Sequence, residues 1–69
     1  MKRYTQNLLT EINSTMLDHR IAVETGCASA HTHELRLKDL MDTVIPLLEP
    51  NQLEELHEGT RQHWVAIFH

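Results

Sequence analysis

The chain has 69 residues, a formal net charge of −4 with neutral histidines, and one cysteine, Cys27. A chain this short forms one small domain, predicted to span residues 1–69, and its single cysteine excludes an intrachain disulfide and fits a reducing compartment, most simply the cytoplasm. No apolar segment reaches the roughly 20 residues of a membrane-spanning helix, no signal peptide is expected at the N-terminus, and no basic cluster predicts nucleic-acid binding.

The first predicted element is an α-helix over residues 5–25. Its apolar residues recur with the period of one helix face, and Thr5 can cap its start through the side-chain hydroxyl. Gly26 suits the left-handed position that follows the end of many helices. His19 lies near the centre of the apolar face and is expected to be buried there. The other members of this face are Tyr4, Leu8, Leu9, Ile12, Met16, Ala22 and Val23.

The second predicted helix, over residues 30–48, carries a broad apolar stripe that the rest of the chain is expected to cover. Ser29 or Thr32 can cap its start. Pro46 removes one backbone hydrogen bond on the solvent side, so the helix either kinks there or stops near Ile45. The stripe consists of Leu37, Leu40, Met41, Val44, Ile45 and Leu48.

The third predicted helix spans residues 50–67. Pro50 fits its first position, where the missing backbone N–H needs no partner. Gly59 weakens this helix by about 1 kcal/mol relative to alanine. Its inner face is predicted to hold Leu53, Leu56, Thr60, Trp64 and Ile67, with Phe68 at the margin.

These elements predict an all-α protein with little or no strand, because β-branched residues never alternate as a strand requires. Two architectures satisfy the pattern. Short connections favour antiparallel neighbours, which gives a small three-helix bundle. Alternatively, the chain forms a helical hairpin whose second arm bends between Pro46 and Pro50, and two such hairpins pair into a dimeric bundle. The small size and the broad apolar stripes favour the oligomer slightly.

The six histidines and Cys27 raise the question of a metal site. Thiolate and imidazole are the usual zinc ligands, but zinc signatures consist of two paired half-sites at fixed spacing, and this chain has only one cysteine. We therefore predict no metal and no cofactor, and expect the histidines to pack at the edges of the apolar stripes. If a metal site did form, its ligands would come from Cys27, His31, His33, His57 and His63.

The sequence contains no catalytic motif, so we expect no enzymatic activity. Cys27 follows the end of a helix, where the helix dipole disfavours a thiolate. His19 suggests a different property, since burial disfavours the charged form of histidine. Stability would then be lost as the pH falls below the ordinary histidine pKa of about 6.5.

The acidic charge and the surplus apolar residues favour a protein that binds other proteins, which we expect to be a cytoplasmic homodimer with a regulatory or accessory role. Small acidic helical proteins of this kind are common in phages and plasmids, which is an association and not a deduction. The predicted interface residues are Leu17, Ile21, Trp64 and Phe68, with Val65 as a further surplus apolar position.

Two alternative functions remain from the sequence. One is a DNA-binding regulator of the helix-turn-helix type, which is disfavoured because three carboxylates near the start of the third helix would face phosphate repulsion. The other is a metal-binding protein that uses the cysteine and histidine candidates named above.

Overall fold

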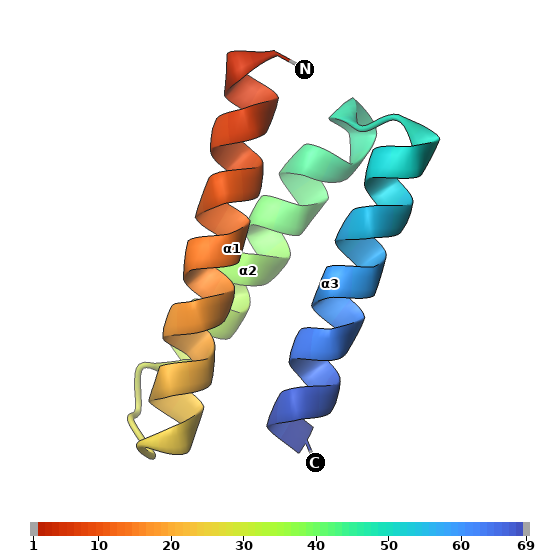
Figure 1. Cartoon of the computed structure of the whole chain (residues 1–69). Helices are drawn as coiled ribbons and strands as arrows, with labels where there is room; N and C mark the ends of the chain where they lie inside the picture. Colours follow the sequence, from red (N-terminus) through yellow and green to blue (C-terminus); the bar gives the residue numbers. More distant parts are fainter. Residues whose placement is uncertain (1, 69) are drawn as a thin grey trace.

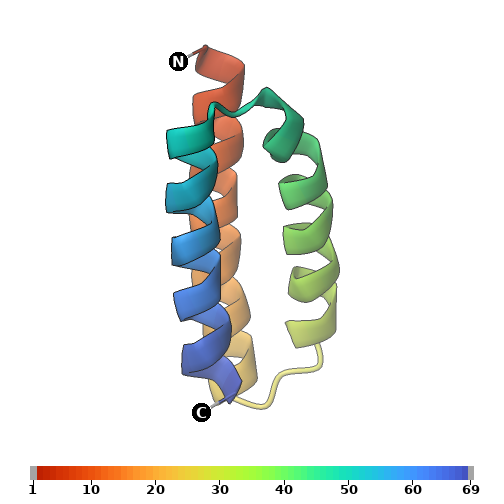
Figure 2. The same cartoon turned by 90° about the vertical axis from the view of Figure 1, so that its right-hand side faces the viewer.

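The computed structural model describes residues 2–68, which form three α-helices and one short 3₁₀ helix and contain no strand. The elements are α1 (Arg3–Glu24), α2 (Ala30–Val44), η1 (Ile45–Leu47) and α3 (Pro50–Phe68). α2 runs antiparallel to α1, and α3 folds back so that it runs in the same direction as α1 (Figures 1 and 2). The predicted all-α fold is therefore confirmed, and the single chain adopts the three-helix bundle of the two predicted architectures.

The ends of α1 differ in how well the sequence predicted them. The helix begins at Arg3, the capping position is occupied by Lys2, and Thr5 is buried inside the first turns. The predicted cap at Thr5 is therefore wrong, because the Gln6 N–H already donates to the Lys2 carbonyl at 3.0 Å. At the other end Gly26 has a φ of +68°, as predicted.

The glycine at the end of α1 belongs to a Schellman motif. The Cys27 N–H donates to the Ala22 carbonyl at 2.8 Å, and the Gly26 N–H donates to the Val23 carbonyl at 3.2 Å. These two bonds satisfy carbonyls that the end of the helix would otherwise leave without partners. The motif also reverses the chain, so that α2 can pack against α1.

The two prolines separate α2 from α3. α2 ends at Val44, and residues Ile45–Leu47 around Pro46 form the 3₁₀ turn η1. Pro46 therefore ends the helix and does not kink it. Pro50 is the first residue of α3, as predicted, and the Glu49 N–H donates to the Gln52 side chain at 3.0 Å. That contact supplies one half of a capping box.

All three helices contribute to the core. Ile12 of α1, Leu37 and Val44 of α2, and Leu56 of α3 form one buried cluster. The apolar periodicity therefore identified the correct face of each helix. Partly buried residues that pack against the cluster are Leu8, Leu9, Met16, Leu40, Met41, Ile45, Leu48 and Trp64.

Buried polar side chains are paired within this core. The hydroxyls of Thr15 and Thr60 donate to the carbonyls of Glu11 and Leu56, one turn earlier, at 2.7 and 3.0 Å. Among residues 2–68 no buried side-chain nitrogen or oxygen lacks a hydrogen-bond partner. Threonine can therefore fill core positions here without leaving a hydroxyl unsatisfied.

Two residues of the predicted stripe in α1 lie outside the core. Tyr4 and Val23 are exposed, although they share the apolar face with Ile12. They occupy the first and last turns of α1, whereas the buried cluster is built around Ile12 in the middle of the helix. Helical periodicity gives the direction of a side chain but not whether another helix reaches it.

Candidate interaction surface

A groove of about 440 Å³ lies between α1 and α3. Met16 and Leu17 border it from α1, while Gly59 and Ala66 border it from α3. The groove exists because these two positions of α3 carry almost no side chain. No atom beyond the helix's own backbone lies within 4 Å of a Cβ built on Gly59. Leu17 is 60% exposed at the edge of this groove.

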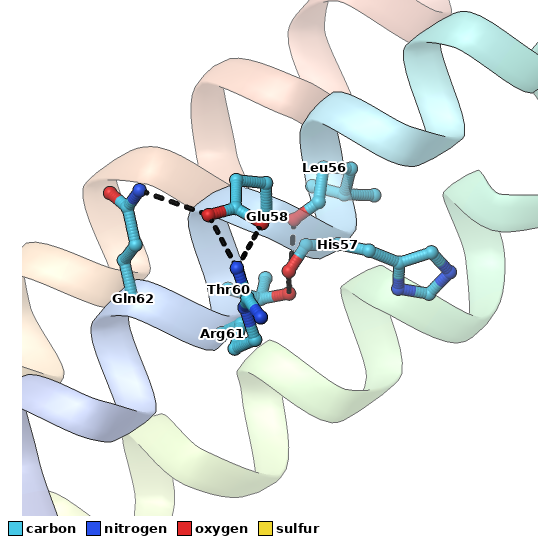
Figure 3. Close-up of polar contacts among 6 residues, drawn as sticks. All are labelled: Leu56, His57, Glu58, Thr60, Arg61 and Gln62. Atoms are coloured by element: carbon cyan, nitrogen blue, oxygen red, sulfur yellow. Dashed lines mark hydrogen bonds and ion pairs between the residues drawn. The ribbon is translucent and has the colours of Figure 1, made fainter.

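The charged groups around the groove are paired with one another. Arg20, which lines the groove, forms an ion pair with Glu24 at 3.2 Å. On α3, Glu58 accepts hydrogen bonds from Arg61 at 2.6 Å and from Gln62 at 3.3 Å (Figure 3). The Arg61 hydrogen bond is the main cause that lowers the pKa of Glu58, and the same bond raises the pKa of Arg61. Arg20, which lines the groove, is therefore neutralised by Glu24, while the Glu58–Arg61 pair lies on α3 outside the groove's lining.

A second groove, of about 370 Å³, lies between α2 and α3. Its apolar border includes Leu35, Met41 and Trp64. Phe68 stacks on Trp64 with ring centroids 5.6 Å apart and ring planes at 10°, and it is 76% exposed. The two grooves lie on opposite sides of α3.

The four predicted interface residues do not form one patch. Leu17 borders the groove between α1 and α3, whereas Trp64 borders the groove between α2 and α3. Ile21 is exposed and lines a shallow hollow beside the connection between α1 and α2. Phe68 stacks on Trp64 and so lies on the same side of α3 as that residue. Trp64 also packs against the core cluster, so part of its surface is already used within the chain.

A pair of histidines lies between α1 and α3. His19 is 3% exposed, as its position on the apolar face predicted, and its Nδ1 lies 2.9 Å from Nε2 of His63. Burial is the main cause that lowers the pKa of His63, and the nearby His19 and Arg20 lower it further. Sequence reasoning did not predict this pair, because helical periodicity does not say which residue of α3 faces His19.

The metal-site candidates do not converge on one point. His63 pairs with His19, while Sγ of Cys27 lies 3.1 Å from the Ser29 hydroxyl. His31 and His57 are exposed, and His33 is half-buried on α2. Among residues 2–68 no three His, Cys, Asp or Glu side chains are grouped so that they could hold a metal ion.

The surroundings of Cys27 differ from the expectation. The Ser29 hydroxyl, and after it the Ser29 backbone N–H, lower the pKa of the Cys27 thiol. Ser29, one of the two predicted caps, occupies the capping position of α2, whereas Thr32 lies inside the helix; the Ser29 side chain makes no capping hydrogen bond there, so the predicted side-chain cap is wrong. The prediction from the sequence used only the position of Cys27 after the end of α1, where the helix dipole opposes a thiolate. It did not include the hydrogen-bond donors of Ser29 at the start of α2.

In the part of the chain that the structure describes, three of the six lysines and arginines form ion pairs with carboxylates. Arg36 of α2 pairs with Glu11 of α1 at 2.6 Å, and Arg20 and Arg61 pair within their own helices. These pairs reduce the positive charge that could meet phosphates. Within residues 2–68 the helices are too short or too polar to cross a bilayer.

Comparisons with protein-family models, with curated proteins and with solved structures found no match to this chain.

Proposed function

We propose that this chain is a non-catalytic helical interaction protein that acts as a homodimer, with a regulatory or accessory role in the cytoplasm. The second copy would dock in the groove between α1 and α3. The observation that carries the proposal is the open space beside Gly59 and Ala66, which lies next to the exposed side chain of Leu17.

The size of the core supports a second copy as the occupant. The buried apolar residues among residues 2–68 are Ile12, Ala22, Leu37, Val44 and Leu56. Chains of this length bury too little apolar surface to be more than marginally stable alone, and oligomerisation is one common remedy. The large apolar side chains left exposed are Tyr4, Leu17, Ile21, Val23, Leu35, Leu47, Val65 and Phe68.

The charges around the groove support self-association as well. Two copies of a chain with a net charge of −4 repel each other at long range. At the groove, however, the lining residue Arg20 is neutralised by its ion pair with Glu24. A closed dimer brings the same surface of both copies together. Charge repulsion between the two copies is therefore smallest where that surface is locally neutral.

The available area is sufficient for such a contact. An interface of standard size buries about 800 Å² on each partner. That is roughly one sixth of the 5036 Å² of accessible surface of this chain. Burying Leu17 at the centre of the contact would supply the apolar anchor that such interfaces use.

Light scattering across a concentration series tests the proposal. We expect the wild-type chain to have the mass of a dimer, with or without a chelator. Leu17→Ser should raise the dimer dissociation constant about tenfold or more, since loss of one buried leucine costs at least about 1.4 kcal/mol. Leu35→Ser is the matched control, because Leu35 is 55% exposed but borders the other groove.

Filling the groove provides a second test. Gly59→Gln adds a side chain beside the groove at a position where a Cβ meets no neighbour, so we expect a folded protein that no longer dimerises. Thr43→Gln places the same residue on the exposed face of α2 and should leave the dimer intact. A wild-type monomer at all concentrations, a dimer that dissociates with chelator, or equal effects of Leu17→Ser and Leu35→Ser would each contradict the proposal.

A further inference from the structure

We propose that the His19–His63 pair is an acid-sensitive latch, which holds α3 on α1 and α2 at neutral pH and releases it when the pair is protonated. The latch acts within one chain, and His63 also lines the groove in which the proposed second copy would dock.

The geometry gives this pair a special place in the bundle. Among residues 2–68, the contact between His19 and His63 is the only side-chain hydrogen bond that joins α3 to another helix. The two residues are 44 positions apart in the chain, and His19 is almost completely buried. The indole of Trp64 packs edge-on against both imidazoles, with centroid distances of 5.3 and 5.4 Å. The pair is therefore the polar centre of the contact between α1 and α3.

Protonation weakens this contact in two steps. In the neutral pair, one of the two facing nitrogens carries a hydrogen and donates it to the other. A first added proton can leave that bond in place, but it puts a positive charge into a buried site. A second proton leaves both facing nitrogens as donors, so the hydrogen bond is lost and two cations face each other.

The charges around the pair do not offset this cost. On α1, Arg20 adds positive charge near His63. On the α2 side, Glu34, Lys38 and Asp42 border the groove at Trp64, and no carboxylate of residues 2–68 forms an ion pair with either imidazole. On α3, the nearest charged residues in sequence, Glu58 and Arg61, pair with each other.

The sign of the effect follows from these surroundings. Burial and positive neighbours lower the pKa of His63 in the folded chain. The unfolded chain therefore binds more protons than the folded chain just below the ordinary histidine pKa of about 6.5. The neutral His63 contributes its full stabilisation of the folded chain above that pH. This contribution is lost as the pH falls toward the lowered pKa of His63 in the folded chain. Most carboxylates remain ionised down to about pH 5, so the protonation of histidine can be separated from the protonation of carboxylates.

Trp64 is the only tryptophan and reports directly on the latch. The experiment follows its fluorescence emission and the urea unfolding midpoint between about pH 7.5 and about pH 5.5. We expect a red shift of the emission and a lower midpoint at the acid end. His63→Phe keeps an aromatic ring but cannot bind a proton, so it should lose at least half of both changes. His31→Gln removes an exposed histidine of α2 and should behave as the wild type.

Histidine NMR titration of the wild-type chain is the second measurement, which applies even if His63→Phe does not fold. The ring of His63 should titrate below the usual histidine range, because burial and its positive neighbours lower its pKa. The response should persist in Leu17→Ser, which the proposed function predicts to dimerise more weakly, because the latch acts within one chain. A Trp64 signal that is constant over this range, or a His63→Phe variant with the wild-type pH profile, would overturn the proposal.

Discussion

The indole of Trp64 lies edge-on against the buried imidazole of His19, with ring centroids 5.3 Å apart and ring planes at 64°. The same indole packs against the apolar cluster formed by Ile12, Leu37, Val44 and Leu56. Trp64 therefore packs α3 against the other two helices. The sequence analysis predicted Trp64 both on the inner face of the third helix and in the dimer interface. The structure assigns its inner side to the core and its outer edge to the groove between α2 and α3.

Replacing Trp64 should therefore destabilise the single chain. We expect Trp64→Ala to lower the free energy of unfolding by about 2–3 kcal/mol, near the lower end for large aromatic residues because Trp64 is only half-buried. Phe68→Ala should cost less than about 1 kcal/mol, since Phe68 is largely exposed and contributes mainly its stacking on Trp64. Urea unfolding followed by circular dichroism measures both variants. Equal losses would show that α3 is not fastened through Trp64.

Two isoleucines of α1 test the orientation of that helix. Ile12 is 0% exposed and Ile21 is 50% exposed, on opposite faces of α1. We expect Ile12→Ala to cost about 3 kcal/mol of unfolding free energy, through lost burial and the cavity left behind. Ile21→Ala should cost under about 1 kcal/mol at a protein concentration low enough to keep the chain monomeric. A larger loss at Ile21 than at Ile12 would mean that α1 is rotated relative to this structure.

The two glycines should respond to alanine in opposite directions. Gly59 lies inside α3 with open space beside its Cα, so Gly59→Ala should raise the free energy of unfolding by about 0.5–1 kcal/mol. Gly26 has a φ of +68°, and Gly26→Ala should lower it by about 1 kcal/mol because alanine is strained there. Thermal unfolding of both variants at one pH gives the comparison. Destabilisation by Gly59→Ala would indicate a contact at Gly59 that this structure lacks.

Cys27 should react with alkylating reagents faster than an ordinary exposed thiol near neutral pH. Hydrogen bonds from Ser29 lower its pKa and so increase the thiolate fraction. Ser29→Ala removes the hydroxyl, which is the larger of these contributions, and should move the alkylation-rate profile to higher pH. Ser14→Ala, on the exposed face of α1, is the control and should leave the profile unchanged. An unchanged profile in Ser29→Ala would show that the hydroxyl does not contact the thiol.

Local chemistry made several features of the fold predictable. Gly26 and Pro50 act through their own backbone restrictions, so their roles at a helix end and a helix start could be read from their identity and position. Pro46 was harder, because a proline can kink a helix or end it, and the outcome depends on whether the following chain folds back. The predicted start of α1 was two residues too late, because Thr5 is a good capping residue by type but is buried within the helix.

The sequence alone determined that this protein is helical, which face of each helix is apolar, and that α1 ends just before Gly26, because these properties depend on periodicity and on single-residue backbone preferences. Only the tertiary structure decided that His19 meets His63 and that Leu17 and Trp64 border different grooves. Those relationships depend on how far α3 is rotated and shifted against α1 and α2. That placement is set by the joint packing of side chains from all three helices, which no single segment of the chain encodes.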